Sequence, residues 1–133
     1  MSLLLKYKKY SQIIFWLWLS IIFVLSILPK TPNLKVELKS GDILGLDYFI
    51  HFAVYFVLAL LFFYWKANNE FKVKLKSALV FIIIGLFCGV AIEACQLFIP
   101  GRAFNIIDIF ANSGGVILGA IIPRFVYRVQ LIN

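Results

Sequence analysis

Charged residues are scarce in this sequence. Only 14% of its 133 residues are Asp, Glu, Lys or Arg, whereas about a quarter of a soluble domain is charged. Hydrophobic residues make up 63% of the chain, and the mean hydropathy is +0.99. These values exclude an ordinary water-soluble domain. They predict an integral membrane protein with room for only a few spans of about 20 residues each.

Cysteines and recognisable reaction motifs are few as well. Cys88 and Cys95 both lie in one apolar run. Seven residues of helix would separate them by about 10 Å, too far for a disulfide within that helix. The sequence contains no G-x-S-x-G, C-x-x-C or H-E-x-x-H motif and no phosphate-binding glycine loop. The chain therefore carries no nucleophile motif that would name a reaction.

Four apolar stretches are long enough to cross a membrane as helices. They cover about residues 11–28, 47–65, 77–98 and 106–122. Pro29 and Pro32 end the first stretch, and a Pro100-Gly101 turn joins the third to the fourth. The sequence therefore predicts an all-α, polytopic membrane protein. We expect a single domain over residues 1–133, with four transmembrane helices in a compact bundle.

The basic residues predict how this bundle is oriented. Nine of the 13 Lys and Arg residues fall in the N-terminus, the second loop and the C-terminus, and four fall in the first and third loops. Because cytoplasmic loops carry the excess of positive charge, both termini are predicted to be cytoplasmic. The net charge of +7 comes from tracts that flank apolar spans. Topology and anionic lipid head groups explain that pattern, so no nucleic-acid partner is expected.

Several polar residues interrupt the predicted spans at helical spacing. Asp47, His51 and Tyr55 recur every four residues and share one face of the second helix. The third and fourth helices each carry a mixed stripe of polar residues and glycines, namely Gly85, Gly89, Glu93 and Gln96 on the third and Asp108, Asn112, Gly115 and Gly119 on the fourth. Glycines four residues apart let helices approach closely, so we expect these two stripes to pack against each other. Their polar ends would then form one pocket open to the extracytoplasmic side, with Arg102 in reach.

Such a pocket would carry an excess of negative charge. Asp47, Glu93, Asp108 and Arg102 together give a net charge of −2 when His51 is neutral. Either some of the acids stay protonated or a cation is bound. Shared protons and pairing with Arg102 suffice, so no cofactor is expected. If a cation is bound, this oxygen-rich set suits Mg²⁺, Mn²⁺ or Ca²⁺ better than Zn²⁺.

The same residues form a longer pattern. It comprises Ser26-x-x-Pro29, Asp47-x-x-x-His51-Phe52-x-x-Tyr55, Glu93-x-x-Gln96-x-Phe98-x-Pro100-Gly101-Arg102 and Asp108-x-x-x-Asn112-x-x-Gly115-x-x-x-Gly119. In this order it resembles the VanZ-like family of small bacterial membrane proteins, over roughly residues 20 to 120. Tyr48 stands where the family usually has lysine, which makes this site more acidic than that of a typical member.

The resemblance implies a multi-pass protein of the bacterial inner membrane with a role in the cell envelope. The family takes its name from a protein associated with teicoplanin resistance, and the resemblance does not extend that property to this chain. We expect the pocket to bind an envelope lipid or a lipid-linked precursor, and either to hold it or to hydrolyse or transfer it. The catalytic candidates are Asp47, His51, Glu93 and Asp108, and the binding candidates are Tyr55, Gln96, Arg102 and Asn112.

Two other functions fit the same residues. In a structural or regulatory subunit, the polar cluster would only specify helix packing, with His51 bonded to Asp47 or Tyr55 and the acids paired with Arg102. A transporter would need a homo-oligomer, because four short helices form a thin wall. Transport also predicts polar residues along the whole path, but the stripes turn to glycine in the cytoplasmic half.

Overall fold

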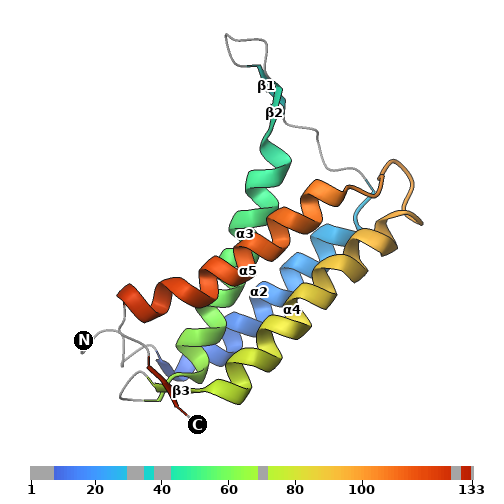
Figure 1. Ribbon diagram of the computed structural model, residues 1–133. Helices are drawn as coiled ribbons and strands as arrows, with labels where there is room; N and C mark the ends of the chain where they lie inside the picture. Colours follow the sequence, from blue (N-terminus) through green and yellow to red (C-terminus); the bar gives the residue numbers. More distant parts are fainter. Residues whose placement is uncertain (1–7, 30–34, 38–42, 69–71, 127–129, 133) are drawn as a thin grey trace.

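The computed structural model describes residues 8–29, 35–37, 43–68, 72–126 and 130–132. Helices dominate this part of the chain, with a few three-residue strands between them (Figure 1). In chain order the elements are η1 (Lys8–Tyr10), α2 (Ser11–Ile27), β1 (Lys35–Glu37), β2 (Ile43–Gly45), α3 (Leu46–Lys66), β3 (Lys72–Lys74), α4 (Leu75–Gln96), α5 (Ile106–Val126) and β4 (Gln130–Ile132).

The four long helices are those that the apolar stretches predict. Each is long and apolar enough to cross a membrane, which confirms the predicted class of fold. Leu28, ahead of Pro29, has an extended backbone (φ −69°, ψ 131°) and ends α2. In the turn between α4 and α5, Gly101 has φ 82°, a conformation that favours glycine. α5 runs beyond the expected end at residue 122 and contains Pro123 within its last turns.

The helices pack as a bundle in which α5 crosses α3. α3 and α5 form the most extensive contact, α4 also packs against α5, and α2 packs against α3 (Figure 1). β3 and β4 pair in parallel, which places the segment after α5 beside the start of α4. β1 and β2 form an antiparallel hairpin ahead of α3. The apolar periodicity gave no sign of these strands.

The two stripes pack against each other only in part. A Cβ at Gly115 would overlap the backbone oxygen of Phe52, and one at Gly119 would lie 2.6 Å from the backbone oxygen of Phe56. Both glycines of α5 therefore face α3. Gly85 and Gly89 of α4 do face α5, where they meet the side chains of Val116 and Asn112. α5 lies between two neighbours and carries two rows with four-residue spacing: Asn112 and Val116 face α4, and Gly115 and Gly119 face α3.

Aromatic side chains fill the bundle at the end where α2 begins and α3 ends. Phe62 stacks on Phe81 with ring centroids 4.0 Å apart, and Phe15 packs against Trp65 at 5.2 Å. Trp18 donates its indole N–H to the Val54 carbonyl at 3.0 Å. Trp18 and Trp65 are therefore partly buried against the core of the bundle.

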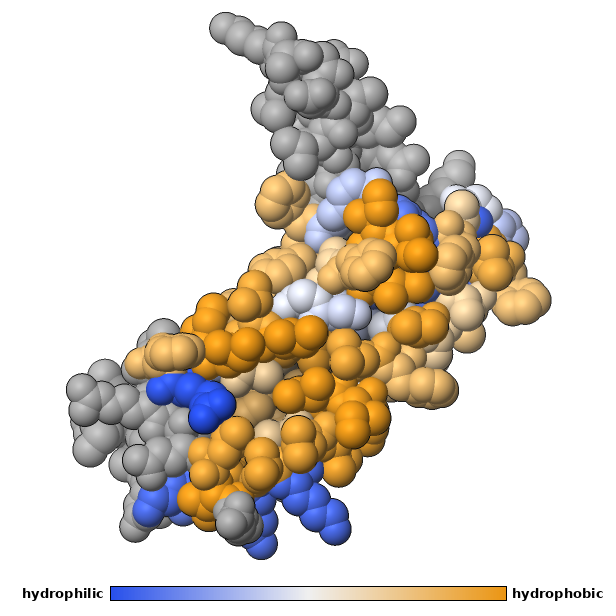
Figure 2. All heavy atoms as spheres, in the orientation of Figure 1, coloured by the Kyte–Doolittle hydropathy of each residue, from blue (hydrophilic) through white to orange (hydrophobic). Residues whose placement is uncertain are grey.

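The outer surface is apolar around the middle of the molecule. Figure 2 shows hydrophobic residues covering the central part of this face and hydrophilic residues at its two ends. Large apolar side chains point outward from the long helices, for example Ile83 at 65% exposure and Phe110 at 70%. An apolar belt between two polar ends is the surface that a membrane-spanning bundle requires.

Candidate functional site

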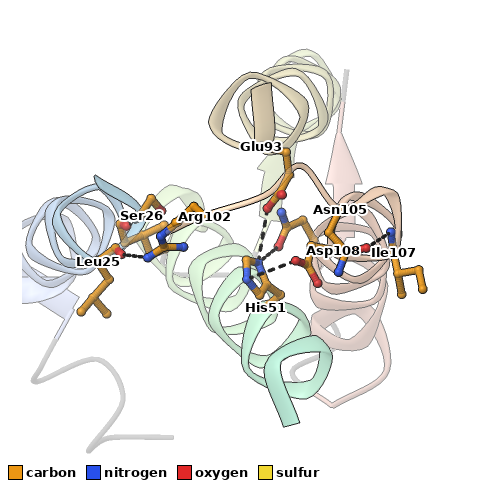
Figure 3. Close-up of polar contacts among 10 residues, drawn as sticks. Leu25, Ser26, His51, Glu93, Arg102, Asn105, Ile107 and Asp108 are labelled. Atoms are coloured by element: carbon orange, nitrogen blue, oxygen red, sulfur yellow. Dashed lines mark hydrogen bonds and ion pairs between the residues drawn. The ribbon is translucent and has the colours of Figure 1, made fainter. Parts of the chain in front are cut away.

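Polar side chains from three helices meet at one end of the bundle. His51 projects from α3, Glu93 from α4 and Asp108 from α5 (Figure 3). Asn112 also lies on α5. His51 Nδ1 lies 3.0 Å from Asn112 Oδ1 and 3.9 Å from Glu93 Oε1. Its other ring nitrogen, Nε2, lies 3.9 Å from Asp108 Oδ2. The imidazole is therefore the centre of the cluster, with one acid near each nitrogen.

The cluster is withdrawn from the surface except at His51, whose side chain is 21% exposed. Glu93 has no exposed area, and Asn112, Gln96 and Asp108 are 1%, 3% and 8% exposed. Neither carboxylate oxygen of Glu93 has a hydrogen-bond partner among the residues that the structure describes, and the same is true of Gln96 Nε2 and Asn112 Nδ2. A buried polar group without a partner costs about 1–3 kcal/mol, and more when it is charged. These buried polar atoms are therefore available to form hydrogen bonds with a ligand.

The contact between His51 and Asn112 favours one tautomer of the imidazole. Asn112 Oδ1 can only accept a hydrogen bond, so the tautomer that uses this 3.0 Å contact carries its proton on Nδ1. In the neutral ring, Nε2 then carries a lone pair directed at the Asp108 side of the cluster.

The start of α5 and the spacing of residues along this helix position its polar groups. Asp108 and Asn112 are one turn apart on α5, so both side chains point to the same side. Asn105 caps this helix, because its Oδ1 accepts the Ile107 N–H at 3.0 Å and its carbonyl accepts the Asp108 N–H at 3.1 Å. Sequence reasoning missed Asn105, although an Asn just before an apolar run is a recognisable start signal.

Arg102 does not take the place expected for it beside the acids. Its Nη2 donates to the Leu25 carbonyl at 2.7 Å and its Nε donates to the Leu28 carbonyl at 3.0 Å. The guanidinium thus binds the end of α2 and points away from His51 (Figure 3). No ion pair between Arg102 and an acid is present among the described residues.

The remaining candidates lie around this core. Tyr55 is one turn below His51 on α3 and is 4% exposed, and its hydroxyl has no partner within the described part of the chain. Gln96 is one turn beyond Glu93 at the end of α4. Asp47 lies in the first turn of α3, but its side chain is outside the described residues.

Three of the candidates could share one metal ion. His51, Glu93 and Asp108 each offer one ligand atom, and these atoms lie within 4.8 Å of one another. The donor set is one imidazole and two carboxylates, which suits a divalent cation. Asp47 is the other acid expected in this set, and its side chain is outside the described residues.

The fold and this cluster define the class of protein. It is a membrane protein with four candidate spans and a cluster of buried polar side chains near one end. The VanZ/LLP1 family model matches residues 4–127, nearly the whole chain. The chain therefore belongs to the VanZ/LLP1 family, as its motifs indicated. No matching curated protein and no matching solved structure was found.

Proposed function

We propose that this protein binds the head group of an envelope lipid or a lipid-linked precursor at the cluster around His51. The observation that carries the proposal is Glu93, a fully buried carboxyl group whose two oxygens have no hydrogen-bond partner among the described residues. Intramembrane ionisable groups are costly and usually serve a function. A bound head group would supply the missing partners.

The other unused groups suggest what such a head group contains. Gln96 Nε2 and Asn112 Nδ2 are donors, whereas the Glu93 carboxylate is an acceptor. Hydroxyl and amide groups of a lipid head group could satisfy both kinds. The exposed apolar surface of the helices offers acyl chains a place beside the bundle. A lipid therefore fits the site better than a water-soluble ligand that must enter from outside the membrane.

The location of the site is part of the proposal. Most of the positive charge of the described residues lies at one end of the bundle, where α3 ends and α4 begins. Its lysines there are Lys66, Lys72, Lys74 and Lys76, and the cluster lies at the other end. By the distribution of positive charge, that end faces the extracytoplasmic side of the bacterial cytoplasmic membrane. Lipid-linked envelope precursors are used on that side.

Chemistry at the head group is a second candidate, favoured by the two acids that flank His51 at 3.9 Å. His51, Glu93 and Asp108 would be the acid–base residues for hydrolysis or transfer at a phosphate or ester. Arg102 was expected as a binding residue, but its guanidinium donates to the α2 carbonyls.

Mass spectrometry of lipids that co-purify with the protein tests the proposal. We expect one class of lipid to be enriched over the bulk membrane in the wild type. Its occupancy should fall about tenfold or more in Glu93→Gln, because one hydrogen bond to a charged group is lost. Glu37→Gln, in the β1–β2 hairpin, is the matched control.

The alternatives predict other results. A structural subunit predicts no enriched lipid and a loss of membrane abundance in Glu93→Gln. A transporter predicts that the purified protein is an oligomer and that ligand crosses reconstituted vesicles. Unchanged lipid content in Glu93→Gln, with normal abundance and thermal stability, would contradict head-group binding at this site.

A further inference from the structure

We infer that His51, Glu93 and Asp108 bind one divalent cation between α3, α4 and α5. This inference goes beyond lipid binding and does not depend on it. It concerns the ion alone, which can be measured without any lipid.

The spacing of the ligand atoms is the first argument. One atom from each of the three side chains lies within 4.8 Å of the others. Nε2 of His51 lies 3.9 Å from Asp108 Oδ2, whereas the nitrogen that lies 3.9 Å from Glu93 Oε1 is Nδ1. A separation of this length is too long for a direct hydrogen bond. Three ligand atoms within 4.8 Å of one another suit a shared ion, because ligands about 2.0–2.6 Å from a common centre lie about 3–5 Å apart.

The orientation of His51 is the second argument. Metal-bound histidines almost always donate the N–H of the other ring nitrogen to a fixed acceptor, which holds the ring and its tautomer. Asn112 Oδ1 is such an acceptor, at 3.0 Å from Nδ1, and Asn112 itself is buried. Nε2 is thereby presented to the side of the cluster that holds Asp108.

Charge and burial are the third argument. Glu93 has no exposed area and, within the described chain, neither of its oxygens receives a hydrogen bond. Its carboxylate points toward the imidazole (Figure 3). A divalent ion would balance Glu93 and Asp108 together and would give the Glu93 oxygens a partner.

The donor set selects the kind of ion. Two carboxylates and one imidazole are harder ligands than the thiolates and multiple imidazoles of typical zinc centres. Mn²⁺ accepts both oxygen and imidazole ligands, and it is also paramagnetic. It is therefore the probe for the experiment.

The full-length protein is purified in detergent, stripped with EDTA and titrated with MnCl₂, and free Mn²⁺ is followed by electron paramagnetic resonance. We expect saturable binding of one ion per chain. Glu93→Gln and Asp108→Asn should each weaken it by about tenfold or more, and Glu37→Gln should leave it unchanged. His51→Asn keeps an amide near the position of Nδ1 but removes Nε2, so it should weaken binding as well.

A measurement on the wild type guards against variants that fail to fold. Pulsed resonance of the bound Mn²⁺ should show coupling to the imidazole nitrogen, and His51→Asn should abolish that coupling. Absence of saturable binding, or binding without nitrogen coupling, would overturn the inference. In that case a proton shared among His51 and the acids balances the cluster. Loss of lipid enrichment in an otherwise Mn²⁺-binding protein would reject the proposed function and leave this inference standing.

Discussion

Arg102 uses its charge to bind the end of a helix. Its two hydrogen bonds go to the carbonyls of Leu25 and Leu28, at 2.7 and 3.0 Å. Carbonyls at the end of a helix have no partners within that helix, and a positive charge there interacts favourably with the helix dipole. The turn after α4 is thereby tied to α2, which otherwise makes little contact with α4 and α5.

Arg102→Gln should therefore lower the stability of the fold without removing the ion or lipid site. We expect a loss of about 1 kcal/mol, because the two charge-assisted bonds are near the surface and partly screened. Arg102→Lys should lose less, since it keeps the charge but not the planar fork. Thermal unfolding in detergent measures the effect, and Arg124→Gln serves as the control for charge alone. Loss of Mn²⁺ binding in Arg102→Gln at unchanged thermal stability would place Arg102 in the site instead.

The position of the cluster was predictable from single residues, but the partner of Arg102 was not. His51, Glu93, Asp108 and Asn112 lie at helical spacing near one end of three apolar spans, and burial of such groups favours their convergence. Arg102 lies in a turn within reach of several groups. Backbone carbonyls occur at every helix end and leave no mark in the sequence, so the pattern could not distinguish them from the acids.

At the scale of helices, the contact between α3 and α5 depends on two glycines. Phe52 and Phe56 bring their backbone oxygens against Gly115 and Gly119, so no side chain fits between the helices there. This close approach holds His51 of α3 beside Asp108 and Asn112 of α5. The sequence showed that both α4 and α5 carry small residues, but not which neighbour each would face. That choice depends on the order of helices around the bundle, which no local pattern specifies.

Gly115→Ala and Gly119→Ala should each destabilise the protein by about 1–3 kcal/mol, because the added methyl group overpacks the interface. Gly119→Ala would place its Cβ 2.7 Å from that of Ala59. Gly114→Ala is the matched control, because its Cβ would lie 3.5 Å from the Phe52 ring, an ordinary contact. Alanine also forms helix better than glycine, so this variant should be neutral or slightly more stable. Thermal unfolding of the three variants checks the order; equal effects would contradict the α3–α5 packing.

The whole molecule is asymmetric along the direction of its helices. Most described basic residues lie at the end where α2 and α4 begin and α3 and α5 end, and these are Lys8, Lys9, Lys66, Lys72, Lys74, Lys76 and Arg124. Lys35 and Arg102 belong to the segments at the other end, near the polar cluster. The positions of the basic residues and of the apolar stretches along the sequence predicted this asymmetry and the four helices. The short strands were not predictable, because three-residue segments carry no periodic signal.

This asymmetry predicts the orientation of the protein in the membrane. Loops with more Lys and Arg stay in the cytoplasm, so the turn between α4 and α5 should face outward. Single cysteines at exposed Phe104 in that turn and at exposed Lys76 near the start of α4 test it, in a protein whose Cys88 and Cys95 are replaced by alanine. A membrane-impermeant maleimide should label the cysteine at 104 in intact cells and the cysteine at 76 only after permeabilisation. The cysteine-free protein gives the background. The reverse pattern would place the polar cluster on the cytoplasmic side, where a lipid-linked precursor would have to be met before it crosses the membrane.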